Sequence, residues 1–247
     1  MPKYDFRMPR LFVDAPLAAA GAVSLDRDQA NYLVNVLRLP HGGELLLFNG
    51  RDGEWRARLA GGKKALTAEV GEQTRAQPPA NDLHFLFAPL KHARLDYLVQ
   101  KAVEMGASRL APVITRFTQV TRVNLERMRA NVIEAAQQCG VLNLPEVAEP
   151  LAFSALGASL EPTRLLVFCD EDAKVQDPIA ALAAARAASS LAVLIGPEGG
   201  FAAEERDALL KRAKVVRLAL GPRILRADTA AVAALALVQA VLGDWRA

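Results

Sequence analysis

The chain has 247 residues and is 52% hydrophobic, which excludes extensive disorder and allows one large domain or two smaller ones. Its formal net charge of +3 is mildly basic, so it suits a nucleic-acid partner without establishing one. The longest apolar run, 229–242, is shorter than the ~20 residues of a membrane span, and the N-terminus resembles no signal peptide. Cys139 and Cys169 lack metal-ligand spacing. We therefore expect a cytoplasmic protein that neither associates with a membrane nor binds a metal.

The first 70 residues have the pattern of short strands joined by tight turns. Gly and Asn, which accept the backbone angles of hairpin turns, cluster at 49–53 and 60–64. One helix is predicted at Asp28–Leu37, because its apolar residues recur at helical spacing. A small antiparallel β-barrel, which leaves no open edge, suits these elements better than an open sheet. The predicted strands are Leu11–Val13, Glu44–Phe48, Glu54–Leu59 and Ala65–Val70.

A polar stretch with a proline pair, 74–81, is predicted to be a linker between domains at 1–73 and 82–247. In the second domain, buried strands alternate with helices. This alternation indicates an α/β fold with a mainly parallel sheet and helices on both faces. The predicted strands are Leu83–Ala88, Arg109–Ile114, Leu165–Cys169, Leu191–Ile195 and Val215–Leu218. The predicted helices are Arg94–Met105, Leu125–Cys139, Pro178–Ala188, Ala203–Ala213 and a last helix from Thr229.

The last helix is apolar on every side from Ala230 to Val238. A helix without a polar face has to be buried all round. It could lie within the cover of the sheet or against another subunit, and the pattern alone favours neither.

Two turns rich in Gly and Pro follow the last two predicted strands, at 196–200 and 221–222. Loops beyond the carboxyl ends of strands are where open α/β sheets bind ligands, because backbone N–H and C=O groups are free there. The first turn matches neither the GxxxxGK[ST] nor the GxGxxG pattern, which disfavours nucleotide hydrolysis and hydride transfer. Together the two turns predict a small-ligand site.

The segments Leu194–Gly200 (LIGPEGG) and Leu220–Ala230 (LGPRILRADTA) together closely resemble motifs of the SPOUT superfamily of methyltransferases. The nearest match is the RsmE family, which methylates N3 of a uridine in 16S ribosomal RNA. Similar strings occur at 8–12 (MPRLF), 36–38 (VLR), 100–106 (QKAVEMG) and 137–140 (QQCG), so the resemblance covers nearly the whole chain. Gln137, Val141 and Asp228 depart from the family pattern, which usually has Glu, Arg and Glu there.

The resemblance implies a C-terminal sheet threaded as a trefoil knot, a PUA-like RNA-binding barrel before it, and a homodimer with knot helices at the interface. It also implies that S-adenosyl-L-methionine is the methyl donor, held largely by main-chain groups, with apolar side chains flanking its adenine. The residues expected at the cofactor are Leu194, Ile195, Gly196, Pro197, Glu198, Gly199, Gly200, Leu218, Leu220, Gly221, Ile224, Leu225, Arg226 and Thr229.

Uridine N3 is a poor nucleophile until its proton leaves, so a group must take that proton or stabilise the resulting anion. Arg226 is the candidate for stabilising the anion and positioning the acceptor, because a guanidinium presents several fixed donors. A salt bridge to Asp228 or Glu198 is its structural alternative. Glu198 is a candidate base, although a carboxylate at a helix start needs no catalytic role, and water could also serve.

The resemblance implies 16S ribosomal RNA of the small subunit as the partner. Because N3 lies on the pairing edge, the target uridine has to be unpaired or flipped out. Lys91 and Arg94 form a basic cluster after a predicted strand, while Arg10, Arg38 and Lys101 fall inside family-like strings. We expect these five side chains to contact RNA, with ordinary solvated surface charge as the alternative.

Two other functions fit the sequence. A non-catalytic, knotted RNA-binding or ribosome-assembly factor is left open by the departure at Asp228. A knotted methyltransferase that acts on transfer RNA is the second alternative, and the whole-length resemblance argues against it.

Overall fold

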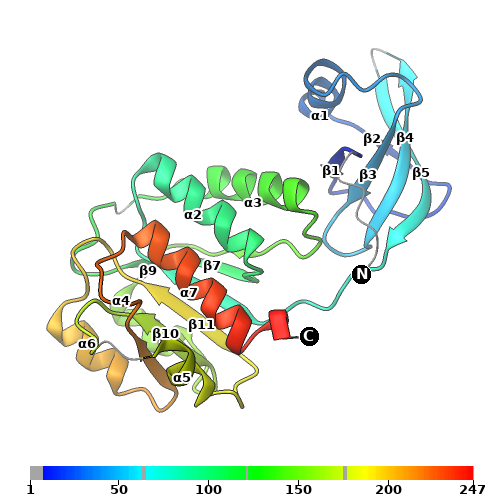
Figure 1. Cartoon of the computed structure of the whole chain (residues 1–247). Coiled ribbons are helices and arrows are strands. Elements are labelled where there is room, and N and C mark those ends of the chain that lie inside the picture. The colour runs from blue at the N-terminus through cyan, green and yellow to red at the C-terminus, as the bar shows by residue number, and fades with distance from the viewer. Residues whose placement is uncertain (1–7, 63–64, 121, 175–176, 247) are drawn as a thin grey trace. The chain divides into compact units, whose positions relative to one another are not determined.

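The computed structural model describes residues 8–62, 65–120, 122–174 and 177–246 (Figure 1). It divides into two compact units. The first ends at Pro79 and also contains Ala136–Leu144, and the second consists of Ala80–Ala135 and the chain from Pro145 onward. The sequence predicted that the chain passes between the domains once. In the structure it passes between the two units three times.

The first unit contains a five-stranded sheet in the order β1 (Arg10–Phe12), β3 (Glu44–Phe48), β4 (Glu54–Gly62), β5 (Ala65–Arg75) and β2 (Ala22–Ser24). Its neighbours are antiparallel except β1 and β3, which run parallel. The predicted all-antiparallel arrangement is wrong at this pair, because the long connection after β1 lets the chain return in the same direction. The sequence prediction missed β2, because its three residues are too few to show an alternating pattern.

The predicted helix of this unit is confirmed in position but not in form. Helix α1 (Arg27–Asn31) is capped by Asp26, whose side chain accepts a hydrogen bond from the Gln29 amide, and it continues as a π-helix over Tyr32–Val36. The wider turn breaks the helical spacing on which the prediction relied. Leu33 is buried, whereas Val34 and Leu37 are 43% and 38% exposed.

Three charged side chains from three strands meet inside the first unit. Arg10 Nε lies 3.1 Å from Glu54 Oε2, and Arg75 Nη2 lies 2.6 Å from the same oxygen. Burial alone would raise the pKa of Glu54, but hydrogen bonding and charge from Arg75, with help from Thr74 and Arg10, hold it below its ordinary value. Thr74 and Arg75 thus belong to β5, although the sequence assigned them to a linker.

The segment Ala136–Leu144 belongs to the first unit through polar contacts with it. Gln137 Oε1 accepts a hydrogen bond from the Phe12 amide at 2.9 Å, and Arg75 Nη2 donates to the Gly140 carbonyl at 3.0 Å. Gln137 is one of the departures from the family pattern. Its carbonyl oxygen makes a contact that the oxygen of a glutamate could also make.

The second unit contains a parallel sheet in the order β12 (Val215–Leu218), β10 (Leu165–Cys169), β11 (Leu191–Ile195), β6 (Leu83–Phe87), β7 (Arg109–Ile114) and β8 (Glu146–Val147). The short strand β9 (Leu151–Ala152) pairs with the end of β7. Every described pair in this sheet is parallel. Because β10 and β11 are buried along their whole lengths, they read in the sequence as continuous apolar runs.

Helices cover both faces of this sheet, as the sequence predicted (Figure 1). One face, with Leu86, Phe168 and Leu194, packs against Leu156 and Leu209 of two short helices. The C-terminal helix packs against β11 and two other helices, and a 3-10 turn at Asp244–Arg246 follows it. The helices are α2 (His92–Glu104), α3 (Leu125–Cys139), α4 (Phe153–Ser159), α5 (Pro178–Ala183), α6 (Ala203–Leu210) and α7 (Ala227–Val241). Among the described residues, none of the helices is long and apolar enough to cross a membrane.

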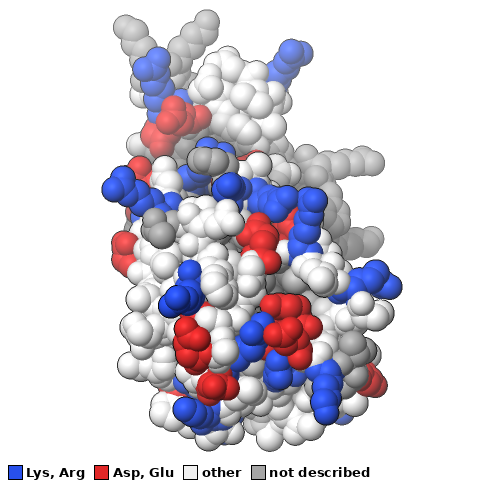
Figure 2. Space-filling view, turned by 90° about the vertical axis from the view of Figure 1, so that its left-hand side faces the viewer, with Lys and Arg blue, Asp and Glu red and all other residues white. Residues whose placement is uncertain are grey.

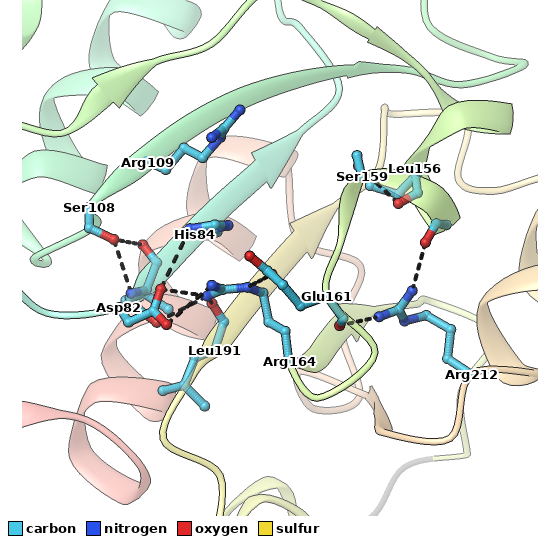
Figure 3. A network of polar contacts seen from close by, with 12 residues as sticks. Asp82, His84, Ser108, Arg109, Leu156, Ser159, Glu161, Arg164, Leu191 and Arg212 are labelled. Atoms are coloured by element: carbon cyan, nitrogen blue, oxygen red, sulfur yellow. Dashed lines mark hydrogen bonds and ion pairs between the residues drawn. The ribbon is translucent and has the colours of Figure 1, made fainter.

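A polar network holds the amino ends of the strands together (Figure 3). The buried Arg164 guanidinium donates to the Asp82 and Glu161 carboxylates, at 2.7 Å in each case, and to the Leu191 carbonyl. The hydrogen bond from Arg164 lowers the pKa of Glu161 to about 2, and burial lowers the pKa of His84 beside it. Because this network occupies the amino ends of the strands, the carboxyl ends are the ones available for a ligand.

Candidate functional site

A cavity of about 460 Å³ opens at the carboxyl ends of β10, β11 and β12. Its walls come from the three loops that follow these strands, at 169–173, 195–199 and 218–227, and from Ala230 on α7. The volume falls within the ~300–1,000 Å³ of sites for small molecules and cofactors. The predicted small-ligand site therefore has a cavity at the expected edge of the sheet.

Most residues predicted for the cofactor lie on the wall of this cavity. They come from both predicted turns, which the sheet order brings close together because β10 alone separates β11 from β12. The predicted residues that line it are Ile195, Gly196, Pro197, Glu198, Gly199, Leu218, Leu220, Gly221, Ile224, Leu225 and Arg226.

Three predicted residues do not line the cavity. Leu194 is fully buried on the face of the sheet that packs against α4 and α6, because alternate residues of a strand face opposite ways. Gly200 lies behind the wall, against Glu171, and Thr229 is exposed on the first turn of α7. These three positions lie outside the described lining of the cavity, and direct cofactor contact at them stays a prediction.

The loop after β10 contributes wall residues that the sequence analysis missed: Cys169, Asp170, Glu171 and Ala173. Their only sequence signal was an acidic run directly after a buried strand. Neighbouring strands could not be identified without the sheet order, so this loop was not connected with the two glycine-rich turns. Burial raises the pKa of Cys169 to about 12, which keeps its thiol protonated at neutral pH.

Asp170 fastens this loop to its neighbours. Its buried side chain pairs with Arg217 at 2.8 Å and with Arg206 at 3.1 Å, and its amide donates to the Leu218 carbonyl. Arg206 also pairs with Glu171 and Asp172. The three acidic groups lie close enough to offer ligands to a metal ion. Because these carboxylates pair with arginine side chains, we assign them to holding the loop in place and not to binding a metal.

Two glycines of the site depend on lacking a side chain. Gly200 has φ +67°, and a Cβ there would lie 1.8 Å from Glu171 Oε1. Gly221 has φ +90°, a backbone conformation that side-chain-bearing residues rarely adopt. Both turns therefore need glycine to bring their backbones around the cavity.

The two predicted catalytic residues differ in their surroundings. Glu198 Oε1 accepts a hydrogen bond from Arg94 Nη1 of α2 at 3.2 Å. Arg226 is exposed and lines the cavity at the start of α7, and no described carboxylate pairs with it. The alternative in which Arg226 forms a salt bridge to Asp228 or Glu198 is therefore wrong within the described structure.

The five side chains predicted to contact RNA are found in different settings. Lys91 is exposed just before α2, and Arg38 is exposed with φ +54°, a strained conformation of the kind that occurs at functional sites. Arg94 pairs with Glu198, and Lys101 pairs with Glu104. Arg10 is only 7% exposed. A buried, paired guanidinium has no face for a phosphate, so the predicted RNA contact of Arg10 is corrected.

Two family models match this chain. The model described as an RNA methyltransferase domain matches residues 77–239, and the model described as an RNA methyltransferase PUA domain matches residues 25–71. Among curated proteins, the ribosomal RNA small subunit methyltransferase E of Rickettsia conorii is 31% identical over 232 residues, which cover 93% of this chain and 94% of that one. The protein of the same name from Bacillus subtilis is 26% identical, over 94% and 96%.

Solved structures are similar over the same length. The ribosomal RNA small subunit methyltransferase E of Neisseria gonorrhoeae, bound to S-adenosyl methionine, aligns with a TM-score of 0.85 and 26% identity, covering 97% of this chain and 100% of that one. A Legionella pneumophila protein in complex with its cofactor, also S-adenosylmethionine, aligns with a TM-score of 0.80 and 27% identity, over 96% and 99%. Both units of this chain therefore occur together in proteins of known structure.

Proposed function

Because this chain belongs to the ribosomal RNA small subunit methyltransferase E family, it is an S-adenosylmethionine-dependent ribosomal RNA methyltransferase, and we propose that its target is N3 of a uridine in 16S ribosomal RNA. The observation that carries the proposal is the cavity at the carboxyl ends of β10, β11 and β12, lined by both glycine-rich turns. The target atom follows from the close resemblance of these turns to the family motifs.

The residues of the cavity fit the methyl donor. Leu218, Leu220 and Leu225 offer apolar surface for an adenine, and Gly196 and Gly221 let backbone polar groups come close to the ligand. Carboxylates on the wall, among them Glu198, complement a positively charged sulfur. When bound, S-adenosylmethionine supplies a methyl group on a sulfonium, which a nucleophile takes in one in-line displacement.

The chain's own residues then have to position the acceptor and stabilise its charge. Arg226 stands on the cavity wall without a described carboxylate partner, so its guanidinium is available to the oxygen atoms of a uracil anion. Glu198 is the candidate to take the N3 proton, and Arg94 donates a hydrogen bond to its carboxylate. Lys91 and Arg38, both exposed, are candidates for phosphate contacts.

The remaining parts of the proposal concern the whole protein. The strand order β12-β10-β11-β6, with loops at one edge, is compatible with the trefoil knot that the family resemblance implies. The first unit would act as a PUA-like RNA-binding domain. The protein would work as a homodimer in the cytoplasm, where ribosomal RNA and ribosomes are found.

The test is methylation of small ribosomal subunits from a strain that lacks the native enzyme, followed by mapping of the modified nucleotide. We expect a methyl group at N3 of one uridine of 16S RNA. Arg226→Ala should lower kcat by about 100-fold or more while the affinity for S-adenosylmethionine changes little, since it removes a donor to the developing charge. A modified transfer RNA, or a binding protein that transfers no methyl group, would support the alternatives.

A further inference from the structure

An aromatic side chain stands exposed beside the cofactor cavity, on the turn that follows β7. Phe117 is 45% exposed. A Cβ on Gly199, which lines the cavity, would lie only 3.2 Å from the Phe117 Cβ. Phe117 therefore lies directly beside Gly199 of the cavity wall, within the second unit.

The turn that carries Phe117 is held firmly in place. The Thr115 amide donates to Thr118 Oγ1 at 2.9 Å, and the Thr118 amide donates to the Thr115 carbonyl at 3.2 Å. The Arg116 amide donates to Glu205 Oε1 at 2.8 Å. An exposed ring on a braced turn loses little freedom when a ligand packs against it.

Glu205 connects this turn to the glycine-rich loop. Its buried carboxylate accepts the Arg116 amide through one oxygen and the Ala202 amide through the other, at 3.0 Å. Glu205 therefore ties the backbone next to Phe117 to the start of α6, two residues after Gly200. Rigid support of this kind keeps a side chain in the geometry that a ligand needs.

Charged side chains of both signs lie near Phe117 and Gly199, where Arg116 pairs with Glu204 and Arg94 pairs with Glu198. Figure 2 looks from the side toward which β11 points in Figure 1, and there Lys and Arg side chains are interspersed with Asp and Glu. Arg116, next to Phe117, is well exposed, and Arg94 is partly exposed where it pairs with Glu198.

We propose that Phe117 is the stacking platform for the target base, so that the flipped-out uracil lies against its ring next to the methyl donor. This inference rests on the proposed function. Single-stranded bases are commonly held by stacking on aromatic side chains, and a neighbouring Arg suits the phosphate of the same nucleotide. The role is positioning and specificity, since the ring exchanges no proton with the base.

The test compares Phe117→Ala, Phe117→Leu and Phe117→Tyr. For each we would measure kcat and KM with small subunits, the Kd for a 16S RNA fragment that contains the target, and the Kd for S-adenosylmethionine by calorimetry. Stacking is worth ~1–3 kcal/mol per base, so Phe117→Ala and Phe117→Leu should lower kcat/KM by about 5-fold to 150-fold. Phe117→Tyr should stay near wild type, and the affinity for S-adenosylmethionine should be unchanged in all three.

Trp245→Ala is the matched control, because Trp245 is 54% exposed and follows the C-terminal end of α7, whereas the cavity lies at the start of that helix. It should leave kcat, KM and both Kd values unchanged. Full activity of Phe117→Ala, full rescue by Phe117→Leu, or an equal loss of S-adenosylmethionine affinity would overturn the proposal. If the wild type methylates a position other than uridine N3, the proposed function fails, while the RNA affinities of the variants still test the stacking.

Discussion

At the scale of single residues, the buried carboxylate of Glu54 gives the sharpest expectation. It is 3% exposed and faces Arg10 and Arg75. Glu54→Gln should cost about 3 kcal/mol of stability, because it removes the negative charge that faces the buried Arg10 and the partly buried Arg75. Hydrogen exchange of the β3–β5 amides would measure the loss. Glu44→Gln in the exposed Arg58 pair is the control and should cost less than about 1 kcal/mol.

The same group makes the stability of the first unit depend on pH. The pKa of Glu54 lies below its ordinary value of 4.5 in the folded protein. Its contribution is therefore complete above that value and is lost as the pH falls through the lower, folded pKa. Glu54→Gln should remove this part of the acid sensitivity. An unchanged acid profile in the variant would contradict the assignment.

Single residues also mark where sequence reasoning reached its limit. Gly196 and Gly221 could be assigned to the site because glycine in a turn after a strand has a physical meaning. Asp170 and Glu205 could not be assigned, because what matters about them is a partner far along the chain. Arg10 was misplaced for the same reason, since only the fold reveals that Glu54 lies beside it.

At the scale of elements, the bounds of the strands were predicted better than the order in which the strands pair. The bounds of β7, β10, β11 and β12 agree with those predicted, because each of these strands is mainly apolar. Helix α3 also has its predicted bounds, whereas α5 and α6 end earlier than expected, at Ala183 and Leu210. Periodicity does not say which strands pair. The place of β10 between β11 and β12 therefore had to come from the structure, and with it the third wall of the cavity.

Helix α7 is the element that we propose to form the dimer contact. It is buried on the side facing α2, α5 and β11, while Val232, Ala233, Ala236 and Leu237 are only half-buried. These apolar residues are the proposed dimer contact. Leu237→Glu should convert a dimer to a folded monomer, because a charge in an apolar interface is costly to desolvate. Sedimentation would measure the mass, with Leu210→Glu on α6 as the control. A wild-type monomer would contradict the proposal.

At the scale of the whole molecule, two compact units share one chain that passes between them three times. A polar network fixes the amino edge of the parallel sheet, and three loops form a cavity at its carboxyl edge. The family resemblance pointed to both parts, but composition and periodicity alone reached only an α/β domain after a strand-rich one. The methyl donor site is the feature on which the proposed activity depends.

The most direct test is a calorimetric titration of S-adenosylmethionine into the wild type, Gly200→Ala and Gly157→Ala. The wild type should bind one molecule per chain. Gly200→Ala should bind at least tenfold more weakly, since φ +67° and the nearby Glu171 oppose a side chain, whereas Gly157, with open space around it in α4, should tolerate alanine. Absence of binding to the wild type, or equal affinity in all three proteins, would contradict the assignment of this cavity.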